Sequence, residues 1–189
     1  MLPALTVSVE LPSTTVSRKQ LDHLELQIGG IPEGTEALAL YIFDDDTPPC
    51  RLKQAQTSGT KPDAFVQGWV EKYGEQQLLQ WPVPFVHAII WQWPLDQAAS
   101  SIRVQLDHAP KEVVYGPNSA NHPVWTPFEP PTGDPIVHHY QFKVLALRGS
   151  SSPPSMGTPF KASLWDQLKE QALAEGETVY SLLNAQIQK

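Results

Sequence analysis

Proline constrains this chain more than any other residue type. Nineteen of the 189 residues are proline, roughly twice the average usage. Proline has no backbone N–H and its ring clashes with the preceding turn of a helix, so a bundle of long helices is excluded. The apolar fraction is 41% and includes six tryptophans, which excludes a disordered proline-rich tail. We therefore expect a compact fold with many turns and few long helices.

Charge and cysteine usage exclude further classes of protein. The formal net charge is −7, whereas a protein that binds nucleic acid needs clustered Lys and Arg. The sole cysteine, Cys50, excludes an internal disulfide or a cysteine-rich zinc site and fits a reducing compartment. The start, Met1 to Thr6, does not read as a signal peptide, and no apolar run is long enough for a transmembrane segment. We predict a soluble, cytoplasmic protein with no nucleic-acid partner.

Alternating or continuous apolar runs predict six β-strands separated by turns. The segment Ala37 to Phe43 is apolar on both faces, so it should lie at the centre of a sheet. The fold class we predict is mainly β, an antiparallel sandwich in a single domain spanning residues 1–189. The predicted strands cover residues 5–9, 24–28, 37–43, 85–93, 101–106 and 137–147.

Helices are predicted in two places. Residues 51–84 form a polar insertion in which Gln54 to Thr60 is expected to be a loop and Asp63 caps one short helix. A C-terminal helix should start at Ser163 and break at Gly176, and residues 178–187 are expected to form a second helix or a docked tail. The fold therefore has one short inserted helix and one or two C-terminal helices.

Three polar side chains and a tyrosine occupy strand positions where apolar residues would be expected. By strand parity, Asp44 faces the same way as Leu40, and His138 the same way as Tyr140. The same parity places His87 on the face of Ile89 and Trp91. Burying such groups is costly unless they bond to each other or to a ligand, so they could converge on one cleft.

Structural roles compete with this interpretation. His87 taken alone is more typical of a core histidine bonded to a backbone carbonyl. Asp44 can equally cap its own turn, and Tyr140 can be a packed core aromatic. A third hypothesis is a metal-dependent enzyme, since His87, His138 and Asp44 have the composition of a two-histidine, one-carboxylate site.

An ordered set of motifs resembles the phosphatidylethanolamine-binding protein family, also called Raf-kinase-inhibitor-like proteins, and most closely its short bacterial branch. The resemblance spans residues 28 to 180 and keeps the family's motif order. The motifs are Ile31-Pro32-Glu33-Gly34-Thr35 leading to Asp44-Asp45-Asp46-Thr47-Pro48; Phe85 to Trp91 with Trp93-Pro94; Gly116-Pro117-Asn118-Ser119 through Pro130-Pro131 and Gly133-Asp134 to His138-His139-Tyr140-Gln141-Phe142; and the tail from Leu168 to Glu177, which resembles a closing helix.

The resemblance implies a non-catalytic protein without a cofactor. Its anion pocket would use Asp44, Asp46, His87, His138 and Tyr140 to bind a small anion or a phospholipid head group such as phosphorylethanolamine. Where the family has a glycine–proline mouth, this chain has Phe128 and Glu129, and a carboxylate there is expected to repel phosphate.

Two further expectations stay open beside the resemblance. The chain could regulate a partner protein through the same pocket, and it could form a homodimer. Alternatively it is a pure interaction module whose pocket is vestigial and whose insertion, with Trp69, docks a protein partner.

Overall fold

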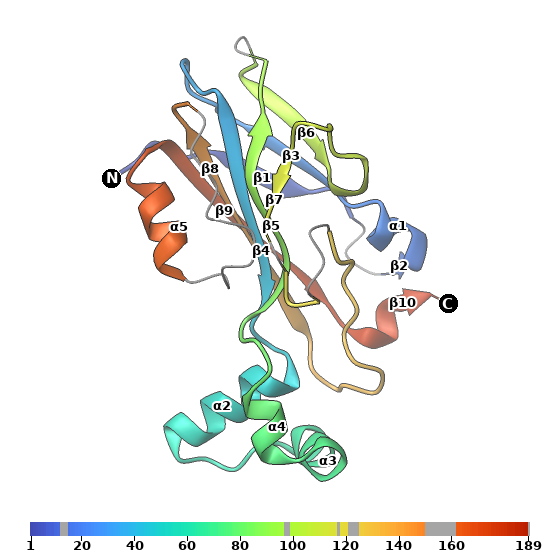
Figure 1. Ribbon diagram of the computed structural model, residues 1–189. Helices are drawn as coiled ribbons and strands as arrows, with labels where there is room; N and C mark the ends of the chain where they lie inside the picture. Colours follow the sequence, from blue (N-terminus) through green and yellow to red (C-terminus); the bar gives the residue numbers. More distant parts are fainter. Residues whose placement is uncertain (12–14, 97–98, 117, 121–124, 150–161, 189) are drawn as a thin grey trace.

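Two antiparallel sheets pack face to face around the main hydrophobic core (Figure 1). The structure is a computed structural model that describes residues 1–11, 15–96, 99–116, 118–120, 125–149 and 162–188, with side chains 162–164 excepted. The larger sheet has the order β7-β5-β4-β8-β9 and the smaller β1-β3-β6, and a short parallel pair joins β2 to β10. The strands are β1 (Thr6–Val9), β2 (Val16–Ser17), β3 (Glu25–Gly29), β4 (Ala37–Asp44), β5 (Phe85–Pro94), β6 (Ser101–Gln105), β7 (Val114–Tyr115), β8 (His138–Leu147), β9 (Ala172–Leu182) and β10 (Ile187–Gln188).

The prediction that residues 37–43 form a central strand is confirmed. Every residue of β4 is buried, because the strand lies between β5 and β8 and both sheet faces are covered. One face carries Leu38, Leu40 and Ile42 into the core between the sheets. The other face carries Tyr41 and Phe43 into a second cluster that also holds side chains of β5, β8 and helix α5 (Ala162–Lys169).

The predicted C-terminal helix is confirmed as α5, although it ends at Lys169 and not at Gly176. The prediction of a second helix or docked tail at residues 178–187 is wrong for most of that range. Residues 172–182 form β9, which pairs with β8 from His138 to Leu147. The closing helix that the resemblance implies for residues 168–177 is also wrong after Lys169, where α5 ends. A local pattern could not reveal this strand because its partner residues in β8 lie 25 to 44 positions earlier, from Leu147 with Ala172 to His138 with Leu182. The capping role expected of Ser163 lies outside the described side chains, as do the prolines at 12, 117 and 123.

The insertion holds three helices instead of one (Figure 1). Helix α2 (Pro48–Ser58) replaces the predicted loop: it begins after Thr47 with two prolines in its first turn and ends at Gly59, which has φ of 67°. Proline is well suited to a first helical turn and glycine to such a C-cap. Helix α3 (Ala64–Tyr73) is capped as predicted, since Asp63 Oδ1 accepts from the Phe65 and Val66 amides. Helix α4 (Glu75–Leu79) completes the group.

These three helices have a small core of their own. Leu52, Val66 and Leu78 are buried together, and Trp69 and Trp81 pack against them edge to face with ring centroids 5.9 Å apart. The group lies beyond the end of the large sheet at which β4 ends and β5 and β8 begin (Figure 1). It therefore forms a wall at that end of the sandwich. Among the described residues, none of the helices is sufficiently long and apolar to span a bilayer.

Gly176, expected to break a helix, instead lets the N-terminal segment cross β9 closely. A Cβ at this position would lie 2.7 Å from Leu5 Cβ, 2.8 Å from the Leu5 carbonyl oxygen and 2.9 Å from Val7 Cγ2. The backbones are also joined there, because the Leu5 amide donates to the Glu175 carbonyl over 2.8 Å. Glycine is thus required by close approach of two backbone segments.

We predict that Gly176→Ala lowers the free energy of unfolding by about 1–3 kcal/mol, the usual cost of forcing an extra carbon into a packed site. Gly68→Ala is the matched control, because a Cβ at this position of α3 meets nothing within 4 Å and alanine is the better helix former by ~1 kcal/mol. Urea unfolding followed by tryptophan fluorescence measures both. Equal effects of the two substitutions would contradict the close approach.

Candidate functional site

The candidate site is built where three neighbouring strands have their ends at the same edge of the large sheet. Asp44, the last residue of β4, pairs in register with Phe85 at the start of β5 and with Tyr140 near the start of β8. His138 opens β8 and is completely buried. Asp44 and His138, far apart in the sequence, therefore meet in space.

A chain of four buried charges runs through this meeting point. His138 Nδ1 donates to Asp44 Oδ2 over 2.7 Å, and His138 Nε2 donates to Asp134 Oδ2 over 3.3 Å. Arg51 of α2 donates to the same Asp134 oxygen over 2.6 Å. Two carboxylates and two cations balance one another, as buried charges must. These four charged side chains connect the inserted helices to the loop before β8 and to the end of β4.

The environment of His138 fixes its charge. Burial alone lowers an imidazole pKa, but the hydrogen bond to Asp44 and the negative charges of Asp44 and Asp134 outweigh it, so the pKa of His138 is raised. Both ring nitrogens donate to carboxylates, which is the hydrogen-bonding pattern of an imidazolium. His138 therefore acts as an internal cation that neutralises Asp44.

A β-bulge changes the face of the sheet on which the His87 side chain lies. Ala88 pairs with Ile42 and Val86 with Phe43, so His87 is an extra residue in β5 at this point. The parity prediction that placed His87 with Ile89 and Trp91 is therefore wrong, because a bulge turns the following or preceding side chains to the other face. His87 instead lies against Tyr140, with ring centroids 5.3 Å apart.

The tautomer of His87 follows from its partners. Nδ1 lies 2.9 Å from the Thr126 carbonyl oxygen, which can only accept, so Nδ1 carries the hydrogen. Burial lowers the pKa of His87 to about 4, and the ring is neutral at physiological pH. Nε2 then presents a lone pair. It is buried and has no hydrogen-bond partner among the described residues.

Tyr140 lies beneath an aromatic cover that the sequence did not reveal. Phe128 is fully buried and stacks on the Tyr140 ring with a centroid distance of 3.8 Å, and it meets the His87 ring edge to face at 5.1 Å. Burial raises the pKa of Tyr140 far above its ordinary value. Its hydroxyl has no hydrogen-bond partner in the described part of the chain. Tyr140 is therefore a neutral group whose ring packs against the ring of His87.

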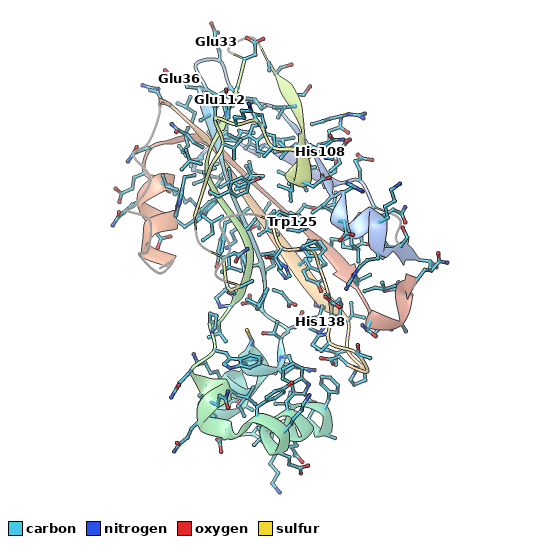
Figure 2. The ribbon with its side chains drawn as sticks, turned by 45° about the vertical axis from the view of Figure 1, so that its right-hand side comes forward. Glu33, Glu36, His108, Glu112, Trp125 and His138 are labelled. Carbon is cyan, nitrogen blue, oxygen red and sulfur yellow. The ribbon has the colours of Figure 1, made fainter. Side chains whose placement is uncertain are left out.

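A pocket of about 790 Å³ opens beside Asp44 and His87. The proline-rich loop before β8 supplies one side, and the inserted segment supplies the other through Trp69 and Lys72 of α3 and through Trp81, which follows α4. These three were not predicted as site residues, since only the tertiary contact of the insertion with the strand ends brings them there. Figure 2 shows His138 at the end of the sandwich that faces these helices, with Trp125 further along the sheet. The lining side chains are Asp44, Thr47, Pro49, Trp69, Lys72, Trp81, Pro82, Phe85, His87, Ser119, Thr126, Pro127, Glu129, Pro130, Pro131 and Thr132.

Two of the five residues expected to form the anion pocket line it, and the other three do not. Asp44 and His87 line it, while His138 and Tyr140 lie buried behind them. Asp46 is engaged elsewhere, because its Oδ2 accepts from both the backbone amide and Nδ1 of His139 over 2.8 Å. Glu129 does line the pocket, and its charge is offset by Arg18, which donates to it over 2.7 Å.

The hypothesis of a two-histidine, one-carboxylate metal site at these residues finds no support in the geometry. His138 donates through both nitrogens and offers no lone pair. Asp44 and His87 alone are too few ligands for a closed or catalytic site.

We predict that Arg51→Met destabilises the protein by about 3 kcal/mol or more, because it leaves Asp134 with one fewer cation in a buried site. Arg103→Met is the control: Arg103 also pairs with a carboxylate, Glu25 at 3.3 Å, but its side chain is 70% exposed, and such pairs contribute at most ~1 kcal/mol. Chemical denaturation of both variants at pH 7 provides the test. If both variants lose a small and equal amount of unfolding free energy, the buried ion pairs do not stabilise the protein.

A second prediction concerns pH. As pH falls from 6.5 towards 4, the unfolded chain protonates His87 while the folded chain, with its pKa of about 4, does not. At pH 4.5 this should lower the free energy of unfolding by about 2–3 kcal/mol. His138 acts in the opposite direction: because its pKa is raised, its stabilising contribution grows as pH falls through 6.5 and is complete below that pH.

His87→Gln removes the titrating imidazole. Between pH 7 and pH 4.5 the free energy of unfolding of this variant should therefore fall by about 2–3 kcal/mol less than that of the natural chain. The comparison of the two unfolding free energies at each pH isolates the histidine from the titrating carboxylates. Identical pH dependence in both proteins would show that His87 is not held neutral.

The chain is similar to known proteins in both sequence and structure. The family model described as phosphatidylethanolamine-binding protein matches residues 74–181, more than half of the chain. No curated protein matches the sequence. Among solved structures, a homologue of these proteins from Chlamydia trachomatis has a TM-score of 0.60 and 19% identity, covering 95% of this chain and 97% of that one. YbcL of E. coli, described as a new member of the mammalian family, has a TM-score of 0.57 and 20% identity, covering 94% and 96%. These identities establish likeness of fold.

Proposed function

The chain belongs to the phosphatidylethanolamine-binding protein family, and we propose that it binds a small phosphate monoester, such as the free head group phosphorylethanolamine, without catalysing a reaction on it. The ligand site is the pocket beside Asp44 and His87. The observation that carries this proposal is that His87 lines the pocket while its buried Nε2 has no hydrogen-bond partner among the described residues. A buried polar atom without a partner is costly, and a ligand that supplies one removes that cost.

The neutral state of His87 determines which form of phosphate fits. Nε2 accepts and does not donate, so it pairs with the protonated oxygen of a phosphate monoanion. The hydroxyls of Ser119 and Thr126 line the same pocket, and each accepts a protein hydrogen bond while retaining one O–H to donate. Lys72, the one Lys or Arg among the described lining residues, supplies positive charge.

The carboxylates of the pocket suit the other end of a zwitterionic head group. Asp44 is neutralised from behind by His138, whereas Glu129 is largely exposed at 65% and paired only at the surface with Arg18. An ammonium group can donate to Glu129 while the phosphate contacts Lys72 and His87. Phosphorylethanolamine carries both groups, so the carboxylate that would repel a simple anion is consistent with this ligand.

Titrations of inorganic phosphate, phosphorylethanolamine and inorganic sulfate, followed by histidine NMR shifts, test the proposal. Phosphate affinity should fall about tenfold per pH unit above pH 7, as the monoanion is lost. Sulfate has no acidic proton in this range, so it should bind more weakly than phosphate at pH 6. Phosphorylethanolamine should bind more tightly than either. Absence of any His87 response at millimolar phosphate and phosphorylethanolamine would refute ligand binding at this site.

Lys72→Gln supplies a variant that spares the core, because Lys72 is exposed. It should weaken phosphorylethanolamine binding about tenfold, the value of one charge-assisted hydrogen bond. Lys111→Gln, at an exposed lysine outside the pocket lining, is the matched control and should leave the affinity unchanged. Equal affinities of the two variants would contradict the place assigned to the phosphate.

A further inference from the structure

A second cluster of histidine and carboxylate side chains lies outside the pocket. His23 follows helix α1 (Arg18–Asp22), and Asp107 and His108 belong to the short 3₁₀ turn η1 (Leu106–His108) after β6. One ligand atom from each of the three lies within 4.8 Å of the other two, the one such group of three in the described ranges. His108 lies well away from His138 and from helices α2–α4 (Figure 2). The cluster is therefore separate from the ligand site.

The three side chains converge on one carboxylate oxygen. Nδ1 of His23 contacts Asp107 Oδ2, and Nδ1 of His108 lies 2.6 Å from the same oxygen. The two imidazole rings are 5.9 Å apart between centroids and inclined by only 30°, so they flank the carboxylate as a pair. Two imidazole nitrogens and one carboxylate oxygen that lie within 4.8 Å of one another form a three-ligand set that borderline divalent metals prefer.

The backbone holds these groups on two separate elements. The His23 amide donates to the Lys19 carbonyl over 3.1 Å and closes α1, while Asp107 is held in η1 with its side chain 18% exposed. The histidine side chains are 50% and 67% exposed, so their rings can rotate to the ~2.1 Å metal–nitrogen distance. Asp107 also lines a hollow of about 430 Å³ with Asp22, which leaves room for water or another donor on the ion.

We propose that His23, Asp107 and His108 form a binding site for a late first-row divalent metal ion, of which Zn²⁺ is the biologically common example. Each imidazole gives its Nδ1 lone pair to the ion and keeps its hydrogen on Nε2, and Asp107 gives a carboxylate oxygen. The bound ion links His23, which follows α1, to η1, which follows β6. Three protein ligands leave coordination positions open to solvent.

The test uses the full chain, stripped with a chelator and dialysed, and titrated with Zn²⁺ by calorimetry and with Co²⁺ by absorption spectroscopy. We expect one equivalent of Zn²⁺ and a Co²⁺ spectrum with ligand-field bands. His23→Ala and His108→Ala should each lower Zn²⁺ affinity by more than about tenfold, since even outer residues of metal sites contribute that much. Paramagnetic broadening by Co²⁺ should reach the His23 and His108 signals and spare His138.

His139→Ala is the matched control. His139 is also exposed, at 55%, and its Nδ1 also lies 2.8 Å from an aspartate oxygen, but no third ligand from the described part of the chain joins that pair. Unchanged Zn²⁺ affinity in this variant supports the site. The proposal fails if the natural chain binds no stoichiometric Zn²⁺, or if His139→Ala weakens binding as much as His23→Ala does. Phosphorylethanolamine titrations of the same variants should be unaffected, so this test is independent of the pocket.

Discussion

The buried chain of charges from Asp44 through His138 and Asp134 to Arg51 is the interaction on which the site depends. A carboxylate at the end of a central, enclosed strand would be strongly destabilising without a cation beside it. His138 supplies that cation from the neighbouring strand, and Arg51 compensates the second carboxylate from the inserted helices. The same contacts that neutralise Asp44 therefore also fasten the helical wall of the pocket to the sheet.

The bulge at His87 gives the pocket its chemical character. Without it, this side chain would lie on the face that carries Ile89 and Trp91, away from Tyr140. With it, the ring lies against Tyr140 and Phe128, its Nδ1 hydrogen is used by Thr126, and a lone pair remains for the pocket. A neutral acceptor in an aromatic setting favours a ligand that carries a proton to donate, and this distinguishes a phosphate monoanion or an ammonium from a bare dianion.

Local signals predicted some elements of the wall and missed others for identifiable reasons. The cap at Asp63 and the apolar positions that follow it predicted α3 correctly. The glutamine-rich segment after Cys50 has few apolar residues, so it lacks the periodicity that marks a helix, although its prolines and Gly59 suit the two ends of α2. Its helical state is stabilised by packing of Leu52 against α3 and α4, which no local pattern contains.

The sequence by itself determined the β-rich class, the central position of residues 37–43 and the shared face of His138 and Tyr140, because these depend on apolar patterning and strand periodicity. It also carried the ordered motifs of the family. The tertiary structure decided what these residues do: Asp44 and His138 pair, Asp46 turns to His139, and β9 forms a strand where a helix or tail was expected. Register, bulges and long-range pairing are contacts between distant segments, and the free energy that selects them exists only once those segments meet.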